Sequence, residues 1–131
     1  MMKPAPRRQK TSDGPREAVI QQQIREALGS MDDVLLYRNT VGVARTASGG
    51  MQRFGLCVGS SDLVGILRIG SVGVALFLEV KKPGGKQSDE QRMFEGVIDR
   101  FCGIYMVADS VESAVAQLEA ARKRYRKLIL S

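Results

Sequence analysis

The sequence predicts a small α/β domain with a central mixed β-sheet flanked by helices, in the order α-β-β-β-α-β-α. Short apolar runs of strand length alternate with amphipathic stretches of helix length. The runs 63–67 and 74–80 are joined by a short, glycine-containing turn, which favours an antiparallel hairpin. The run 74–80 then leads through a helix to the run 104–108, so these two strands are expected to be parallel.

The chain is expected to contain one structured domain between two charged ends. Residues 1–15 carry four basic groups, three prolines and few apolar side chains, and are predicted to form a disordered basic arm. Residues 16–127 are expected to form the domain, and residues 128–131 a C-terminal tail. A domain of this length is large enough to bury a real core.

The first helix is expected over about residues 16–28, where apolar side chains recur at helical spacing. Ser12 or Asp13 is suited to cap this helix, and Gly29 to end it. The apolar run 34–38 then predicts the first strand.

A long stretch rich in Gly, Ser and Thr, residues 39–59, follows this strand. The stretch contains Arg45 and Arg53, and Arg38 directly precedes it. A further short strand is expected to start at Phe54. Because loops of this length in small domains usually carry function, the stretch is predicted to be a loop that contacts phosphates.

Two further helices are expected in the second half of the chain. Ser88 and Gln91 have the spacing of a capping box, which predicts the start of a helix over residues 89–101. One apolar face of this helix is expected to consist of Met93, Phe94, Val97, Ile98 and Phe101. A last helix is expected over about residues 111–125.

The chain has no histidine and only two cysteines. The lack of histidine excludes Ser-His-Asp and Cys-His catalysis, histidine-based zinc sites and nucleases whose general base is histidine. Cys57 and Cys102 lie among apolar residues and are predicted to be reduced and buried, rather than joined in a disulfide or bound to a metal. Any acid–base or metal chemistry must therefore use Asp, Glu, Lys, Tyr and backbone groups.

The net charge of +6 is distributed unevenly along the chain. Residues 1–16 carry +4 and residues 122–131 carry +5, whereas the body between them carries −3. Basic ends of this kind suit attraction to a polyanion, although they also serve solubility alone.

A membrane partner is not expected. No apolar run reaches the roughly 20 residues that a membrane-spanning helix needs. The N-terminal stretch has no apolar signal core. The expected location is therefore intracellular, in the cytoplasm.

Charged residues occur at the end of the strand 74–80 and directly after it. Glu79 and Lys81 lie two residues apart, so they are expected to project from the same face of the strand. An ionised pair in so apolar a strand is costly unless a metal ion compensates it, and the alternative is a simple ion pair of Glu79 with Lys81 or Lys82. The antiparallel hairpin places Asp62 beside Glu79, which favours the metal site.

Five short motifs occur in a fixed order along the chain. They are Glu17 on the first helix, Arg38-Asn39-Thr40-Val41-Gly42, Gly59-Ser60-Ser61-Asp62, Glu79-Val80-Lys81 and Lys86-Gln87-Ser88-Asp89-Glu90-Gln91. This set resembles the PD-(D/E)xK nucleases, and specifically the virus-type replication-repair nuclease (VRR-NUC) domain, over about residues 16–108. The family commonly has proline where this chain has Ser61, a position that shapes a turn and does no chemistry.

The resemblance implies a restriction-endonuclease-like core and divalent-metal-dependent cleavage of phosphodiester bonds. Asp62, Glu79 and the backbone carbonyl of Val80 would bind Mg²⁺ or Mn²⁺, because these ions prefer oxygen ligands. Glu17 would complete the site directly or through water. The alternative for Glu17 is an interaction with the dipole at the start of the first helix.

Lys81 would orient or deprotonate the attacking water, or stabilise charge in the transition state. Gln91 would position Lys81 or this water. The alternative for Gln91 is simple capping of its helix together with Ser88.

The expected partner is DNA, contacted through its phosphates and recognised by shape rather than sequence. Besides the two basic ends, the candidate DNA-binding residues are Arg38, Arg45, Arg53, Lys82 and Lys86. Stand-alone members of the family resemble phage proteins that act as dimers on branched DNA, like Holliday junction resolvases, which implies a homodimer. The alternatives are a non-catalytic DNA-binding module and a nuclease subunit of a larger replication or repair complex.

Overall fold

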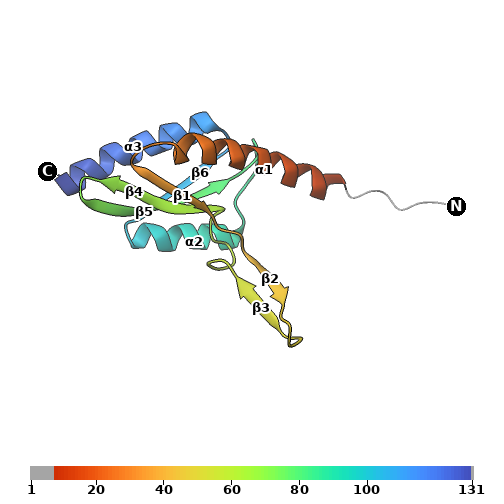
Figure 1. Cartoon of the computed structure of the whole chain (residues 1–131). Coiled ribbons are helices and arrows are strands. Elements are labelled where there is room, and N and C mark those ends of the chain that lie inside the picture. Colours follow the sequence, from red (N-terminus) through yellow and green to blue (C-terminus); the bar gives the residue numbers. More distant parts are fainter. Residues whose placement is uncertain (1–7, 131) are drawn as a thin grey trace.

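The computed structural model describes residues 8–130, which form three helices and six strands (Figure 1). The helices are α1 (Arg8–Gly29), α2 (Asp89–Arg100) and α3 (Val111–Leu130). The central sheet contains β1 (Val34–Arg38), β4 (Leu63–Ile69), β5 (Val72–Val80) and β6 (Ile104–Ala108), in the spatial order β1-β4-β5-β6. A separate two-stranded sheet consists of β2 (Gly42–Arg45) and β3 (Met51–Phe54). The predicted α/β class with a mixed central sheet and three helices is confirmed.

The directions of the central strands follow from their connections. β1 and β4 are antiparallel, as are β4 and β5, which a tight turn joins. β5 and β6 are parallel, and α2 connects them, as the sequence predicted. Leu63 pairs with Leu78, so the residue before β4 lies beside the end of β5.

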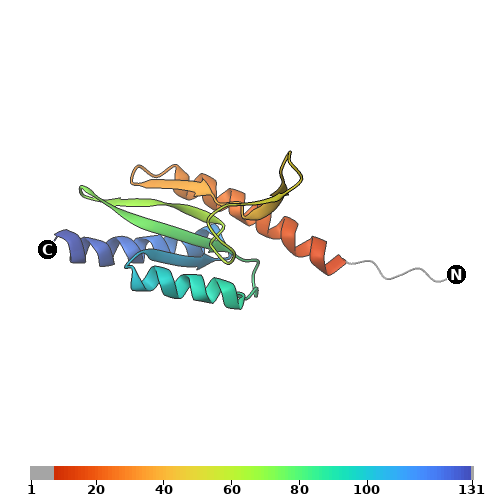
Figure 2. The same cartoon turned by 90° about the horizontal axis from the view of Figure 1, so that it is seen from below.

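The helices cover the two faces of the central sheet unequally. α1 and α3 lie together on one face and α2 lies on the other, as Figures 1 and 2 show from two directions. The core lies under α1 and α3, because alternate side chains of the strands point to this face. Its fully buried side chains include Ile24, Leu28, Leu63, Leu67, Leu76, Leu78, Val80 and Leu118.

The face under α2 is smaller and aromatic. Phe94 packs edge-on against Phe77 and Tyr105, with ring centroids 5.3 Å and 6.2 Å apart. The predicted five-residue apolar face of α2 is wrong in part, because Met93 and Phe101 are 72% and 80% exposed. Successive side chains of a helix are rotated by about 100°, so only some of the apolar side chains of α2 can face the sheet. None of the residues of α2 is buried.

Both ends of the domain contain more helix than predicted. α1 begins at Arg8, so residues 8–15 are helical rather than part of an arm, and residues 1–7 lie outside the described residues. The predicted cap at Ser12 or Asp13 is wrong, because both residues lie inside α1. α3 continues to Leu130 because residues 111–130 contain neither Gly nor Pro.

The predicted long loop contains a hairpin that was not expected. β2 and β3 are antiparallel, and Arg45 pairs with Met51 next to the turn. In the turn, the N–H of Thr46 donates to the carbonyl of Gly50, and Gly49 has a positive φ of 93°. The strands are only four residues long and are exposed at every position except Gly42, so no buried apolar pattern marked them.

The two cysteines are free, but their predicted burial is wrong, because both are exposed. Cys102 follows α2 with a φ of 64°, in the left-handed conformation that often ends a helix. Cys57 follows β3 in the irregular segment before β4. Apolar neighbours in sequence do not bury a side chain that lies in a turn.

A buried arginine joins α3 to the start of β1. The guanidinium of Arg122 donates two hydrogen bonds of 2.8 Å to the carboxylate of Asp33, and also contacts Glu119. Arg122 is 9% exposed, and its hydrogen bond lowers the pKa of Asp33. The basic C-terminal end therefore provides one fewer exposed cation for DNA than the sequence predicted.

No helix within residues 8–130 is long and apolar enough to cross a lipid bilayer.

Candidate active site

Asp62, Glu79 and Lys81 meet at one end of the central sheet. Asp62 immediately precedes β4, and Glu79 lies at the end of β5, where the register of the hairpin brings them together. The ammonium nitrogen of Lys81 lies 3.4 Å from Oε2 of Glu79. The structure thus brings together the three residues that the sequence placed at the centre of the site.

Two hydrogen bonds fix the backbone at the end of β5. The N–H of Val80 donates to Oδ2 of Asp62 at 2.8 Å, and the N–H of Lys81 donates to the carbonyl of Ala108 on β6 at 2.9 Å. Because the carbonyl and N–H of one trans peptide point in opposite directions, the carbonyl of Val80 is directed away from β6, to the side of Asp62. The backbone oxygen predicted as a metal ligand therefore lies on the side of the strand where a ligand set can form.

Glu79 is a buried carboxylate with one unpartnered oxygen. The residue is 2% exposed, and its Oε2 interacts with both Lys81 and the side-chain amide of Gln91. Its Oε1 is buried and has no hydrogen-bond partner among the described residues. Buried polar atoms are nearly always paired, so this oxygen is suited to bind a group that supplies positive charge.

Burial and mutual repulsion raise the pKa values of both carboxyl groups. Burial and the charge of Asp62 raise the pKa of Glu79 to about 7, and Lys81 opposes this shift. Burial also raises the pKa of Asp62, against the effect of the hydrogen bond from Val80, and the charge of Glu17 adds to the increase. The site therefore favours protons or other cations near neutral pH.

Gln91 has the capping role that the sequence offered as an alternative, and it also contacts the candidate site. Its backbone N–H and its side-chain Oε1 complete the capping box with Ser88. Its Nε2 donates to Oε2 of Glu79 at 2.5 Å. Gln91 thus contacts Glu79, whereas the sequence predicted that it positions Lys81 or the attacking water.

Glu17 lies at the edge of the site. Its Oε2 accepts a 3.5 Å hydrogen bond from the backbone N–H of Lys82. The dipole interpretation of Glu17 is wrong, because α1 begins at Arg8 and Glu17 lies well inside the helix. Among residues 16–130, whose side chains the structure describes, no three Asp, Glu, Cys or His side chains are grouped closely enough to hold a metal ion.

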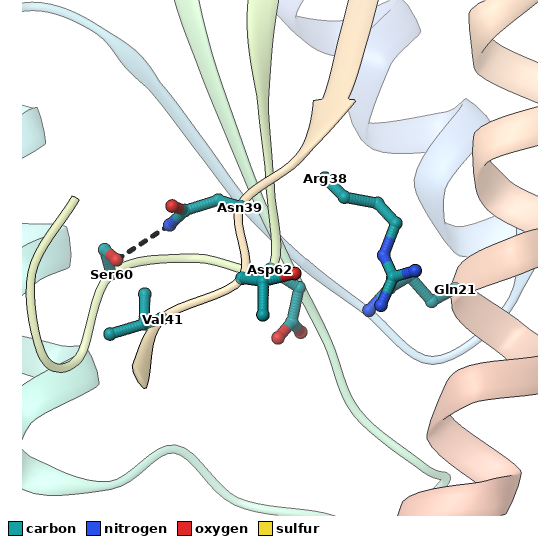
Figure 3. Close-up of a pocket in the computed structure, with 7 residues that line it drawn as sticks. Gln21, Arg38, Asn39, Val41, Ser60 and Asp62 are labelled. Atoms are coloured by element: carbon teal, nitrogen blue, oxygen red, sulfur yellow. Dashed lines mark hydrogen bonds between the residues drawn. The ribbon is translucent and has the colours of Figure 1, made fainter. Parts of the chain in front are cut away.

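A polar cavity of about 260 Å³ opens beside Asp62. Its lining residues, most of them labelled in Figure 3, are Gln21, Arg38, Asn39, Thr40, Val41, Ser60 and Asp62. Asp62 points into this space, and the side chain of Arg38 extends across it toward Gln21 on α1 (Figure 3). The cavity therefore contains a cationic side chain, Arg38, together with a carboxylate, Asp62.

Asn39 organises the wall of this cavity, a role that the sequence analysis did not assign. Its Nδ2 donates to Oγ of Ser60 and to the carbonyl of Ser61, both at 2.8 Å. Its Oδ1 accepts from the N–H of Leu56, and its own N–H donates to the carbonyl of Asp62. Asn39 was only one mark of the family resemblance, because no local pattern predicts bonds across twenty residues.

The predicted DNA-binding residues are spread around the site. Arg38 lines the cavity, and Arg45 and Arg53 are exposed on the β2–β3 hairpin. Lys86 is exposed in the segment before α2, whereas Lys82 is only half-exposed. These cations therefore belong to several different segments of the chain.

The raised pKa of Glu79 predicts that, in the absence of metal, the stability of the folded protein decreases as pH rises. The unfolded chain releases this proton near its ordinary pKa of 4.5, whereas the folded protein holds it up to about 7. The folded state thus binds more protons between these values, so the free energy of unfolding decreases as pH rises through this interval, by about 3 kcal/mol.

Urea denaturation in EDTA at pH 5 and pH 8 measures this change. Glu79→Gln is the matched control, because glutamine resembles the protonated carboxyl group and cannot titrate. An equal loss of stability in wild type and variant would show that another group causes the dependence.

Comparisons of the chain with protein-family models, curated proteins and solved structures find no match.

Proposed function

We propose that this protein is a divalent-metal-dependent endodeoxyribonuclease of the VRR-NUC type, with a restriction-endonuclease-like core. The observation that carries the proposal is the cluster of Asp62, Glu79 and Lys81, in which a buried carboxylate oxygen has no partner. Paired carboxylates followed by a lysine suit metal-assisted hydrolysis, which needs no histidine.

The donor atoms at the site fit Mg²⁺ or Mn²⁺. Asp62, Glu79 and the carbonyl of Val80 supply only oxygen, which hard cations prefer. Mg²⁺ usually keeps several waters and needs one or two carboxylates, so a group of three acidic side chains is not required. When bound, such an ion activates water as a nucleophile and polarises the scissile phosphate.

The side chains around the carboxylates have distinct roles in this proposal. Gln91 and Lys81 hold Oε2 of Glu79, which leaves Oε1 for the metal. The ammonium group of Lys81 is also positioned to stabilise charge that develops on the phosphate. Arg38 in the cavity beside Asp62 would bind a neighbouring phosphate.

The proposed substrate is branched DNA inside the cell, and the proposed assembly is a homodimer. A four-way junction is resolved by two symmetrical cuts, so two active sites related by a twofold axis suit it. Dispersed exposed arginines favour phosphate contacts and recognition of shape over readout of bases.

Cleavage of labelled DNA tests the function directly. The purified protein is incubated with four-way-junction, flap, single-stranded and linear duplex DNA, with Mg²⁺, Mn²⁺ or EDTA. We expect cleavage that requires metal, is strongest on the junction and is absent in Glu79→Ala. Binding without cleavage under every metal would contradict the proposal.

The 3.4 Å contact of Glu79 with Lys81 favours one alternative, a non-catalytic DNA-binding module in which this pair is only structural. Thermal unfolding at pH 8 distinguishes the two. A catalytic site predicts that Mg²⁺ raises the Tm of wild type but not of Glu79→Gln, because only a binding ligand stabilises the folded state. If the protein is instead a non-catalytic DNA-binding module, Mg²⁺ should change the Tm of neither wild type nor Glu79→Gln.

A further inference from the structure

The β2–β3 hairpin carries a surface that the proposed chemistry does not use. We name residues 42–54 the ribbon. It projects away from the central sheet and its helices, as both Figure 1 and Figure 2 show. The ribbon shares no strand pairing with the central sheet.

One side of the ribbon combines two cations with two apolar side chains. Val43 pairs with Arg53, and Arg45 pairs with Met51. Directly opposite residues of an antiparallel pair share a face, so these four side chains lie on one side of the ribbon. Val43 and Met51 are 51% and 64% exposed, and both arginines are exposed.

The ribbon itself carries only positive charge. The chain has no Asp or Glu between Asp33 and Asp62, and Arg38 lies at the base of the ribbon. A surface with arginines and no carboxylates is complementary to a nucleic acid and not to a basic or neutral protein surface.

The base of the ribbon is fixed to the candidate active site. Asn39 precedes the ribbon and bonds to Leu56, to Ser60 and to the backbone of Asp62, which all follow it, so it links the two ends of the ribbon. Gly55 has a φ of 86°, and a Cβ there would lie 2.5 Å from the carbonyl oxygen of Thr40. The ribbon therefore leaves the domain in a defined direction beside Asp62.

We propose that the ribbon reads the branch point of the DNA substrate: Arg45 and Arg53 hold phosphates that flank it, and Val43 and Met51 pack on its unstacked bases. This inference rests on the proposed action on branched DNA. Phosphates alone give the two exposed apolar side chains nothing to contact, whereas a branch point interrupts base stacking and exposes apolar base faces. Proteins that insert apolar side chains between basic contacts use the same combination.

Metal-free binding tests the ribbon separately from cleavage. The full chain is titrated in EDTA against a four-way junction and a linear duplex of the same sequence, by fluorescence anisotropy over a series of salt concentrations. 2-Aminopurine at the branch point reports contact with unstacked bases. The ribbon variants are Arg45→Ala/Arg53→Ala and Val43→Ser/Met51→Ser. The matched controls are Arg68→Ala at the far end of the central sheet and Met93→Ser on α2, both exposed in the structure.

We expect the arginine variant to bind both DNAs more weakly and to reduce the slope of log K against log salt by about two, one for each lost phosphate contact. The apolar variant should lose about tenfold in junction affinity and less than about twofold in duplex affinity, because base contacts exist only at the branch. It should also lose the 2-aminopurine signal. The two control variants should bind like wild type.

Three results would overturn the inference. Normal junction binding by both ribbon variants would remove the ribbon from the interface. An equal loss on junction and duplex in the apolar variant would make the ribbon a general phosphate clamp. If the ribbon variants bind DNA normally but differ from wild type in the molecular mass measured by light scattering, the ribbon is instead a contact between copies of the chain.

The wild type could also fail to cleave any DNA and yet need its ribbon to bind junctions. That result would contradict only the nuclease proposal, since metal-free binding does not depend on cleavage.

Discussion

Lys81→Ala is expected to slow metal-dependent cleavage by about 10²–10⁴-fold at pH 9, where folding and metal binding are largely retained. The ammonium group lies 3.4 Å from Glu79 and, in the proposed mechanism, supplies positive charge or orients water at the reacting phosphate. The substitution removes no proposed metal ligand, since those are oxygen atoms of Asp62, Glu79 and Val80. Single-turnover cleavage and the Mg²⁺-dependent shift in Tm measure the two properties separately.

An indirect effect of this substitution needs its own control. Lys81 lowers the pKa of Glu79, so its removal raises that pKa and weakens metal binding near neutral pH. If Lys81 acts only in this way, cleavage by the variant should recover between pH 7 and pH 9. A direct role predicts that the defect persists at pH 9. Asp62→Asn is the comparison, because it should impair metal binding itself at every pH.

Arg122→Ala is expected to lower the free energy of unfolding by about 3 kcal/mol, the largest loss of stability predicted for an exchange outside the hydrophobic core. The two 2.8 Å hydrogen bonds to Asp33 are lost, and the carboxylate, whose side chain is 24% exposed, remains without its partner. The ordinary pKa of Asp33 should be restored at the same time, because Arg122 is the main cause of its lowering.

Urea denaturation at pH 7 measures this loss. Lys123→Ala is the matched control, because it removes a neighbouring exposed cation from the same helix. The loss in Arg122→Ala should diminish as pH falls below the ordinary pKa of aspartate, because a protonated Asp33 needs no cationic partner. A loss of the same size in Lys123→Ala would mean that the charge of the helix, and not the buried pair, provides the stability.

The sequence predicted best where neighbouring residues determine the structure. The capping box of Ser88 and Gln91 is a local arrangement, and the structure contains it. The short turn between β4 and β5 fixed their register, so the proximity of Asp62 and Glu79 could also be predicted.

Features that depend on distant contacts could not be predicted. Arg122 occurs in a run of basic residues, and only the fold brings it to Asp33, far away in the sequence. The bonds of Asn39 likewise join segments that the chain separates. The exposure of Cys57 was not predicted because its apolar neighbours in the sequence suggested burial, whereas these neighbours are themselves exposed. Local composition reports the propensity of a segment but not its neighbours in space.

The separation of the ribbon from the central sheet has a consequence for how this protein can evolve. A two-stranded hairpin is marginally stable by itself, so the ribbon contributes little to the stability of the domain. Its exposed residues can therefore change without loss of foldability, and substrate preference can diversify with them. Glu79 and Val80 lie in a buried strand between two layers of helices, where most substitutions are destabilising. Related chains should thus retain the carboxylate cluster while the length and sequence of the ribbon vary.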